Sequence, residues 1–547
     1  MSVLPVGFGA SGVDTGDITK SLRFRASGST YMSRTFGTPT AATTWTFSLW
    51  VKRGTLSTSQ DILWATGSEF YFASDDTLRL YATAADRITT TAKFRDPSSW
   101  LHIVLSNNAN AITLYVNNQS VGTYTGSTTF NTAIAHNFGR NGGGSGYLDG
   151  YGARVCWVDN AALTPSSFGY LNTEINEWVT LSRSACKAVV DAGGTNSFML
   201  DFEDGTSLTT LGNDYSTKNN DWTLTNHSLT AGVTYDWMED RPGNSYCTLN
   251  PIKVASGISA VTYSEGNLRG ASTSNAVGRS QGSVDVTSGK WYAEFNLSNC
   301  SGGTTNWVGV SSDATSRLYY FDGTYWNGSS SGAYGATYTN GDVIGIALDM
   351  DSQTLEFFKN GTSQGQKTSI GLSGSEIRFR ADTFISGGIS FVYANFGQRP
   401  FTYTPPTGFL ALCQANLPEG AVRNPKKHFD AKTRIGTAAT YSVTGIEFQP
   451  DFVWVKSRGR AVDHALYDSV RGVEKRLETN NTDAEVTGDT TGLTAFNSDG
   501  YTGGALDQIN GTTATNSFID WLWKANGAAV SNTNGTITSQ VSANQTA

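Results

Sequence analysis

Short runs of alternating apolar and polar residues recur along this chain of 547 residues, and turn-forming residues end each run. Two examples are Thr46–Val51 (TFSLWV) and Ile112–Val116 (ITLYV), and the second stops at Asn117-Asn118. A period of two places alternate side chains on opposite faces of a strand, so one face of each run can pack against another sheet. The pattern predicts an all-β protein built from stacked sheets.

The composition supports folded β domains and excludes a disordered chain. The sequence has 60 Gly, 15% charged residues and 12% aromatic residues, with a net charge of -8. Aromatic residues in this number supply ample apolar surface, and the charge is small for the length. Because one hydrophobic core does not grow to this size, we expect about three or four folding units.

The first module is expected over residues 19–250, after an N-terminal arm at 1–18 that orders against a partner. Its motifs are TWTFSLWVKRG, SWLHIVL with ITLYVNN, and YLDGYGARVCWVDNAALTPSSFG. This set resembles the laminin-G-like, concanavalin-type jelly roll found at the start of many phage structural proteins. Leu163-Thr164-Pro165 predicts a short helix, and residues 173–192 are the best candidate for a longer one.

A second module is expected over residues 251–412. It contains, in order, GKWYAEF, WVGV, YGATYTNGDVIGIALD, LEFFKNG, and NFGQRPF followed by PPTGF. The segment 341–361 predicts a hairpin closed by Asn360-Gly361, a strong turn signal. The ordered set of motifs closely resembles the SPRY family. The resemblance implies a second β-sandwich, and in both families ligands bind through loops at one end or face.

The rest of the chain predicts a linker at 413–435, a small β module at 436–524 and a polar tail or linker at 525–547. The small module resembles one that recurs on the C-terminal side of phage appendage proteins, with strands at 448–456 and 518–524. The basic residues of the linker are expected to be solvated, because no aromatic side chains lie among them to stack bases. They are Arg423, Lys426, Lys427, His428, Lys432 and Arg434.

Several classes of partner are disfavoured by the sequence. An acidic chain without a concentrated basic face predicts no nucleic acid, and no apolar run is long enough to insert into a membrane. The five cysteines are odd in number and widely spaced, so we expect buried, reduced thiols. The start of the chain lacks a secretory signal pattern, which predicts synthesis and assembly in a cytoplasm.

Three motifs match the letters of catalytic or nucleotide-binding patterns without their context. Gly7–Gly12 (GFGASG) has the dinucleotide fingerprint but no helix after it. Gly361–Gly365 (GTSQG) matches a hydrolase elbow but leaves a hairpin. Asp463-His464 with Ser469 supplies the residue types of a triad, yet adjacent residues of an extended chain point apart. We therefore expect no enzymatic activity.

No cofactor is expected. The five histidines show no spacing typical of a transition-metal site. Asp349-x-Asp351 opens like a calcium loop but lacks the Gly and the Glu of that motif, so we interpret it as a turn between two strands. Calcium stays open for the first module, since some laminin-G-like domains bind it. Its acids Asp75, Asp76 and Asp149 have no diagnostic spacing.

The one cluster that suits a ligand lies at 319–328 (YYFDGTYWNG). Flat aromatic rings beside Asn can stack on the apolar face of a sugar and bind its hydroxyls. We therefore predict a glycan contact at Tyr320, Tyr325, Trp326 and Asn327. The alternative is that these residues alternate within strands and belong to the SPRY core.

The resemblances together imply a structural component of a tailed-bacteriophage virion, either a tail fibre or spike or a head fibre. Such a protein would attach to other virion proteins, form a homo-oligomer with a trimer favoured, and present a face to a host-surface glycan. A dedicated receptor- or glycan-binding protein is the alternative. A polysaccharide depolymerase is disfavoured, because such enzymes are typically repetitive β-helices and no such period is visible.

Overall fold

The computed structural model describes residues 18–252, 261–273, 277–300, 305–418, 422–511, 516–525, 530–533 and 536–541. Within these ranges nearly all of the regular secondary structure is β-strand, as the sequence predicts, and the helices are short. The arm expected at 1–18 lies outside the described residues except for Ile18. Two compact units form: one runs to Pro418 apart from residues 172–176, and the other contains those residues and the chain from 419 onward.

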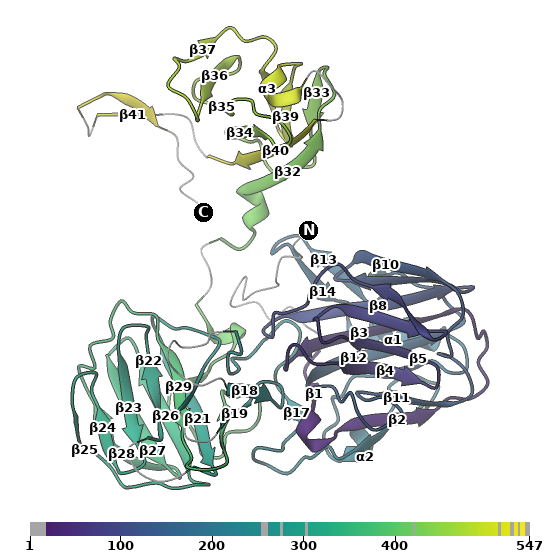
Figure 1. Ribbon diagram of the computed structural model, residues 1–547, viewed down its shortest axis with the longest axis vertical. Helices are drawn as coiled ribbons and strands as arrows, with labels where there is room; N and C mark the ends of the chain where they lie inside the picture. The colour runs from purple at the N-terminus through teal and green to yellow at the C-terminus, as the bar shows by residue number, and fades with distance from the viewer. Residues whose placement is uncertain are drawn as a thin grey trace. The chain divides into compact units, whose positions relative to one another are not determined.

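The first module is a sandwich of two antiparallel sheets (Figure 1). One sheet has the order β10-β9-β8-β3-β12-β1-β17, with β15 also paired to β12, and the other has the order β16-β2-β11-β4-β5-β6-β7. The strands of the first are β1 (Ser21–Phe24), β3 (Trp45–Arg53), β8 (Trp100–Asn108), β9 (Ala111–Val116), β10 (Gln119–Thr125), β12 (Gly150–Asp159), β15 (Phe198–Leu200) and β17 (Trp237–Met238). Those of the second are β2 (Tyr31–Thr35), β4 (Gln60–Ala65), β5 (Ser68–Phe72), β6 (Leu78–Ala82), β7 (Ala85–Thr89), β11 (Ala135–Phe138) and β16 (Thr223–Thr225).

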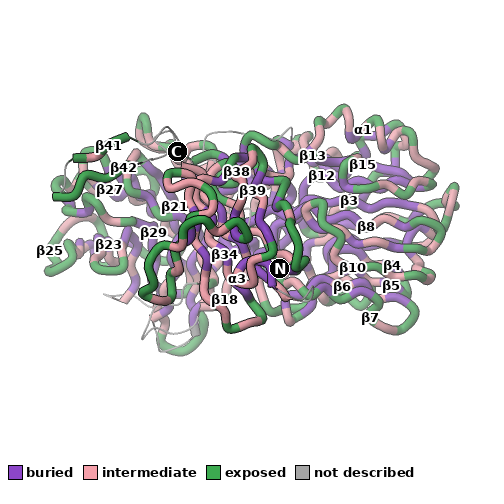
Figure 2. The backbone as a smooth tube through the Cα atoms, turned by 90° about the horizontal axis from the view of Figure 1, so that it is seen from above, coloured by how far each residue is buried: buried purple, intermediate pink, exposed green. Residues whose placement is uncertain are grey.

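The core of this sandwich lies between the two sheets. Trp45 and Trp157 are fully buried and stack with ring centroids 4.8 Å apart. In Figure 2 the central strands β3, β8 and β12 are buried along most of their length. The predicted hairpin of β8 and β9 is confirmed, and Ala109-Asn110 joins its strands.

Short helices and one small hairpin complete the first module. The predicted Thr164-Pro165 start is confirmed as the 3-10 helix η2 (Pro165–Ser167). Of the helix expected over 173–192, only α1 (Arg183–Asp191) forms, because Ser182 caps it and a strand at Glu177–Thr180 precedes it. The remaining elements are η1 (Ala26–Gly28), β13 (Gly169–Asn172), β14 (Glu177–Thr180) and α2 (Leu208–Leu211).

The second module is also a sandwich. One sheet has the order β18-β19-β30-β21-β26-β27-β28, with β31 parallel to β21, and the other has the order β20-β29-β22-β23-β24-β25. The first contains β18 (Val261–Ser264), β19 (Arg269–Thr273), β21 (Lys290–Ser298), β26 (Val343–Asp349), β27 (Thr354–Lys359), β28 (Thr362–Lys367), β30 (Ile389–Asn395) and β31 (Leu410–Ala411). The second contains β20 (Gly278–Gln281), β22 (Trp307–Ser311), β23 (Ser316–Tyr320), β24 (Thr324–Trp326), β25 (Ser331–Ala333) and β29 (Arg378–Thr383).

Two turns of this sandwich were expected from sequence. Asp349 accepts the backbone N–H groups of Asp351 and Ser352, so this segment is the predicted turn, between β26 and β27. Asn360-Gly361 is also a turn, but it joins β27 to β28 and does not close the segment 341–361 as a single hairpin.

The two sandwiches contact each other through buried polar groups. The Asp149 carboxylate accepts the backbone N–H groups of Glu265 and Gly266, both at 2.8 Å, and the Tyr151 hydroxyl donates to the Gly266 carbonyl at 2.8 Å. Leu268 of the second module packs with Tyr151 in a small apolar cluster. The contact therefore combines hydrogen bonds between buried polar groups with packing of apolar side chains.

The boundary between these sandwiches lies slightly before residue 251. Cys247 and Leu249 pack in the core of the second sandwich, and the Cys247 N–H donates to the Leu412 carbonyl at 2.9 Å. The short 3-10 helix η3 (Gln414–Asn416) follows that contact. The chain thus begins the second module a few residues earlier than its strand pattern suggests.

The third module has a sheet of order β32-β40-β34-β35-β36-β37, a sheet of order β33-β39-β38 and the pair β41-β42. Its elements are η4 (Pro425–Lys427), β32 (Phe429–Ile435), β33 (Tyr441–Val443), β34 (Phe452–Ser457), β35 (Ala465–Asp468), β36 (Lys475–Glu478), β37 (Val486–Thr487), β38 (Leu493–Asn497), β39 (Gly500–Gly503), α3 (Asp507–Asn510), β40 (Ser517–Trp523), β41 (Val530–Asn532) and β42 (Ser539–Val541).

The structure corrects the linker expected at 413–435. Its last seven residues are β32, which pairs with β40 along its whole length. Arg434, expected to be solvated, is mostly buried and bonded to Asp520 at 2.7 Å. The segment 525–547, expected as a polar tail or linker, contains β41 and β42.

Candidate functional site

The four residues that the sequence singles out lie on and beside β23 and β24. Tyr325 is 8% exposed and packs in the core, with its ring 5.5 Å from that of Tyr334. Tyr320 and Trp326 are partly exposed, and Asn327 is exposed and accepts backbone N–H groups in a turn. The expectation of an open face at Tyr325 is therefore wrong, because that ring points inward. A glycan contact at this set stays a prediction.

Three partly exposed rings lie together on the outer face of the six-stranded sheet. Val308 and Tyr319 point into the core, so Trp307 and Tyr320, their neighbours in sequence, point outward. These two residues are paired across β22 and β23, and their ring centroids are 5.1 Å apart. Trp326 lies on the same face one strand further along. We call Trp307, Tyr320 and Trp326 the aromatic row.

Polar groups border the aromatic row. Asp382 is paired with Trp307 across the strands and accepts hydrogen bonds from Arg380 at 2.6 and 2.7 Å and from Arg279 at 3.1 Å. Burial raises the pKa of the neighbouring Tyr320 hydroxyl, so that hydroxyl stays neutral at physiological pH. The indole N–H of Trp307 is buried without a hydrogen-bond acceptor. The row thus presents flat aromatic faces beside charged groups that already have partners.

The catalytic motifs considered in the sequence do not assemble into a site. Asp463 and His464 both bond to Asn480, whereas Ser469 bonds to Asp451 at 2.8 Å. The segment Gly361–Gly365 forms a turn and the start of β28. Neither arrangement provides the relay from nucleophile to base to acid that a triad requires.

Acidic residues considered for calcium bond to other protein groups. Asp76 pairs with Arg53 and Arg95, Asp75 pairs with Arg79, and Asp149 accepts backbone N–H groups. Among the described residues, no group of three or more His, Cys, Asp or Glu is placed to hold a metal ion.

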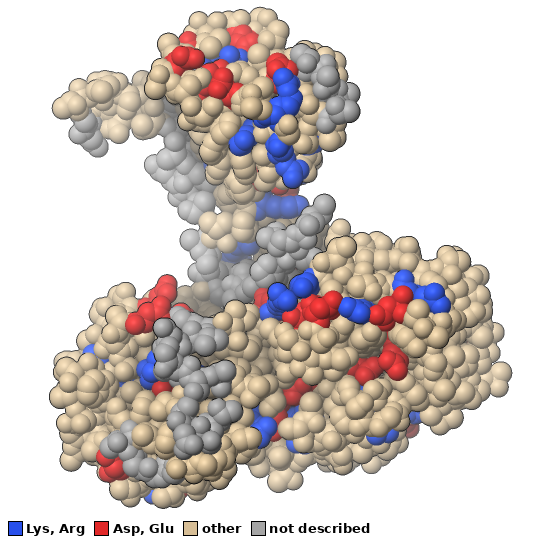
Figure 3. Space-filling view, viewed as in Figure 1, with Lys and Arg blue, Asp and Glu red and all other residues tan. Residues whose placement is uncertain are grey.

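On the face shown in Figure 3, basic and acidic side chains of the first sandwich lie next to each other.

The predicted buried thiols are confirmed: all five cysteines lie in the described ranges, are buried and form no disulfide. In those ranges, no helix combines the length and the apolar character needed to span a membrane.

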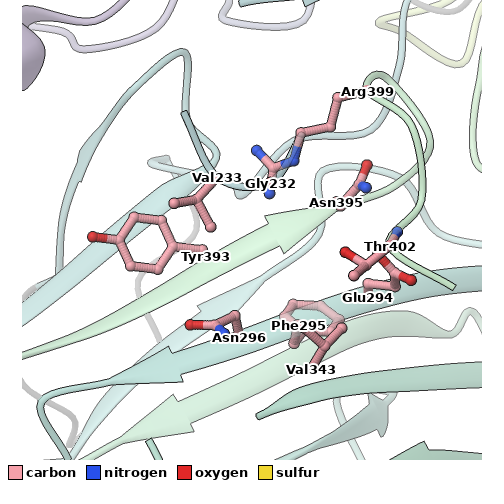
Figure 4. Close-up of a pocket in the computed structure, with 10 residues that line it drawn as sticks. All are labelled: Gly232, Val233, Glu294, Phe295, Asn296, Val343, Tyr393, Asn395, Arg399 and Thr402. Atoms are coloured by element: carbon pink, nitrogen blue, oxygen red, sulfur yellow. The ribbon is translucent and has the colours of Figure 1, made fainter. Parts of the chain in front are cut away.

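A separate pocket of about 240 Å³ opens on the eight-stranded sheet of the second sandwich (Figure 4). Glu294 and Asn296 of β21 and Tyr393 of β30 line it from the sheet. Val233, from a loop of the first sandwich, and Arg399, from the segment after β30, lie on the other side in the close-up. Because both sandwiches contribute, the pocket depends on their contact.

Comparison with protein families assigns three parts of the chain. Residues 26–167 match the concanavalin A-like lectin/glucanases superfamily, residues 267–382 match the SPRY domain, and residues 424–547 match a domain of unknown function. The chain therefore contains a concanavalin-like domain and a SPRY domain, as the sequence motifs indicate.

Individual relatives cover small parts of the chain. An ATP-dependent RNA helicase Ddx1 of Drosophila melanogaster is 34% identical over 93 residues, and an E3 ubiquitin-protein ligase RKP of Arabidopsis thaliana is 30% identical over 142 residues. These alignments cover 17% and 24% of this chain, and 12% and 11% of the two relatives.

Comparison with solved structures also gives matches over parts of the chain. The SPRY domain of human HERC1 is 20% identical, with a TM-score of 0.23, and the match covers 28% of this chain and 99% of that one. A putative carbohydrate binding protein from Bacteroides ovatus is 14% identical, with a TM-score of 0.28, over 38% of this chain and 58% of that one.

Sequence reasoning missed Trp307 and Arg399 as functional candidates. Both lie in motifs that the sequence identified, WVGV and NFGQRPF, but only as strand and closing segment. The alternation of Trp307 with the core residues Val308 and Val310 was the signal that could have placed its ring outward. For Arg399 no local pattern exists, because its surroundings come from both sandwiches.

Proposed function

We propose that this protein is a non-enzymatic binding protein that holds a glycan on the aromatic row, and that it serves as an appendage of a tailed-bacteriophage virion. The observation that carries the binding role is the placement of Trp307, Tyr320 and Trp326 on one partly exposed face. Sugar rings have apolar faces that stack on aromatic rings.

The virion part of the proposal comes from the order of sequence motifs, which resembles phage structural proteins. In that setting the chain would attach to other virion proteins and form a homo-oligomer, with a trimer favoured. Adhesion to a host surface is compatible with this architecture, because several weak sites on one particle act together.

A glycan array with the purified protein tests the binding role. We expect binding to a defined set of bacterial surface glycans, without release of oligosaccharide. Replacing Trp326 or Tyr320 by Ala should weaken binding about tenfold each, since each change removes one stacking ring. Tyr170→Ala removes an exposed ring of the first sandwich and serves as the control. Equal binding by all variants would rule out the aromatic row.

Antibody labelling of purified phage particles tests the virion role independently. We expect label on a head or tail appendage, and absence of the protein from particles would refute this part alone. Release of oligosaccharide by the wild type, lost on replacing one carboxylate, would instead indicate a depolymerase.

A further inference from the structure

The pocket in Figure 4 contains a buried cation whose hydrogen-bonding capacity is incompletely used. Arg399 is 5% exposed, and its Nη2 donates to the Ala394 carbonyl at 3.0 Å. Its Nη1 is buried and has no acceptor. A buried guanidinium nitrogen that lacks an acceptor is costly, because it has lost its water without a replacement.

The acid in the same pocket already has its partners. The two carboxylate oxygens of Glu294 accept the backbone N–H groups of Thr402 and Tyr403, each at 2.8 Å. Glu294 is therefore held by the segment 402–403 and does not bond to Arg399. The unmet capacity at this pocket is that of a donor, so the missing group is an acceptor.

The charged groups around Arg399 are a second arginine and two glutamates. Burial and the nearby Arg23 lower the pKa of Arg399 to about 9. Arg23 is itself bonded to Asp236 at 3.1 Å, so the carboxylate of Asp236 is already shared. Tyr151, Glu265 and Glu294 are the groups that favour the charged form of Arg399.

The walls define what kind of anion fits. Val233 and Val343 contribute apolar surface, and Tyr393 contributes a ring. A small inorganic anion would gain nothing from these walls, whereas an organic acid can bury its carbon skeleton there. Guanidinium and carboxylate groups also match in planar geometry.

We infer that this pocket binds a small organic carboxylate, with Arg399 as its cationic partner and the loop at Gly232-Val233 as its lid-side wall. The site is distinct from the aromatic row, which lies on the other sheet of the second sandwich. It requires both sandwiches, since one supplies the loop and the other supplies the cation.

Thermal melting and calorimetry of the full chain test this site with glucuronate, acetate, glucose and inorganic phosphate. We expect glucuronate and acetate to bind, and glucuronate at ten times its Kd to raise the melting temperature by about 2 °C. Glucose, which has a similar ring without the carboxylate, and phosphate, which lacks an apolar part, should give no shift. An equal shift with glucose or phosphate would overturn the assignment.

Two variants locate the binding. Arg399→Met removes the cation, and Val233→Trp fills the pocket from the first sandwich while keeping Arg399, so the second variant stays informative if the first fails to fold. Both should abolish the glucuronate shift. Lys290→Met removes a half-exposed cation of the same strand as Glu294 and should keep it. A shift that persists in Val233→Trp would place the carboxylate elsewhere and contradict the inference.

Discussion

Tyr325 and Trp326 are neighbours on β24, but the first is buried and the second is partly exposed. Replacing each in turn tests which side chain faces the core. Tyr325→Ala removes a ring from the core of the second sandwich and should lower its stability by about 3 to 5 kcal/mol. Trp326→Ala removes a partly exposed ring and should cost much less. Urea denaturation of both variants measures the difference. Equal losses would mean that Trp326 is also part of the core and unavailable to a glycan.

A buried carboxyl in the first sandwich should make stability depend on pH. Asp61 is 3% exposed, its Oδ1 has no partner, and burial together with Glu69 raises its pKa to about 8. In the unfolded chain the same group titrates near pH 3.9. Between these values the folded state holds a proton that the unfolded state has lost.

The sign of the effect follows from that difference in bound protons. Stability should fall as the pH rises from about 4 to about 8, by at most about 1.4 kcal/mol per pH unit, and Asp61→Asn should remove the fall. Urea denaturation at pH 5 and pH 7.5 measures it. Asp204→Asn replaces an exposed acid whose pKa is lowered by bonds to Thr206, so its effect should be the same at both values. A slope unchanged in Asp61→Asn would contradict the prediction.

At the scale of single residues, the sequence located one useful region but not its geometry. The cluster at 319–328 contains two rings of the aromatic row. It could be found because its aromatic residues are close together in sequence. Which of Tyr325 and Trp326 points inward depends on the register of β24 against β23, and the strand pattern alone leaves both registers open. Trp307 joins them only through pairing across strands.

Among the elements, the turn between β27 and β28 has a strict requirement for glycine. Asn360 and Gly361 have φ values of 48° and 78°, typical of a two-residue hairpin turn, and a Cβ at Gly361 would lie 2.5 Å from the Tyr403 ring. Gly361→Ala should therefore cost more than the 1 kcal/mol or so of the backbone conformation alone.

Gly374→Ala is the matched control for that substitution. Gly374 has a φ of 72° and no atom within 4 Å of an added Cβ, so only the backbone cost remains. The comparison of urea midpoints separates conformational strain from the contact with Tyr403. Indistinguishable midpoints would show that the Tyr403 ring moves aside freely.

The sequence predicted elements well where residues adjacent in the chain determine them. The hairpin of β8 and β9 and the start of η2 depend on turn and capping residues that are neighbours in sequence. The strand β32 was missed although charged and uncharged residues alternate along it, because its basic residues were interpreted as part of a solvated linker. Its partner, β40, lies over 80 residues later in the chain. Pairing between strands so far apart in sequence depends on tertiary packing, which neighbouring residues do not reveal.

At the scale of the whole molecule, the contact between the two sandwiches should make them unfold together. Asp149→Ala would leave the buried N–H groups of Glu265 and Gly266 without an acceptor, at a cost of about 1 to 3 kcal/mol each. Calorimetry should show one transition for both sandwiches in the wild type and two in the variant.

Asp75→Ala is the control for this prediction, since Asp75 is a partly exposed acid of the same sandwich and pairs with Arg79. It should keep the single transition. A wild type that already melts in two separate steps would show that the contact is too weak to couple the sandwiches.

The contact between the two sandwiches also limits where recombination with a related gene can preserve the fold. A recombinant that exchanged only the first sandwich would need an acid in place of Asp149 and a hydroxyl in place of Tyr151. Only then could it form the hydrogen bonds to the turn at Glu265-Gly266. A donor without them would leave those buried backbone groups unpaired, and the hybrid would lose the coupling between its two sandwiches. We expect natural mosaics to inherit residues 19–412 as one block, with crossovers falling on the C-terminal side of Pro418.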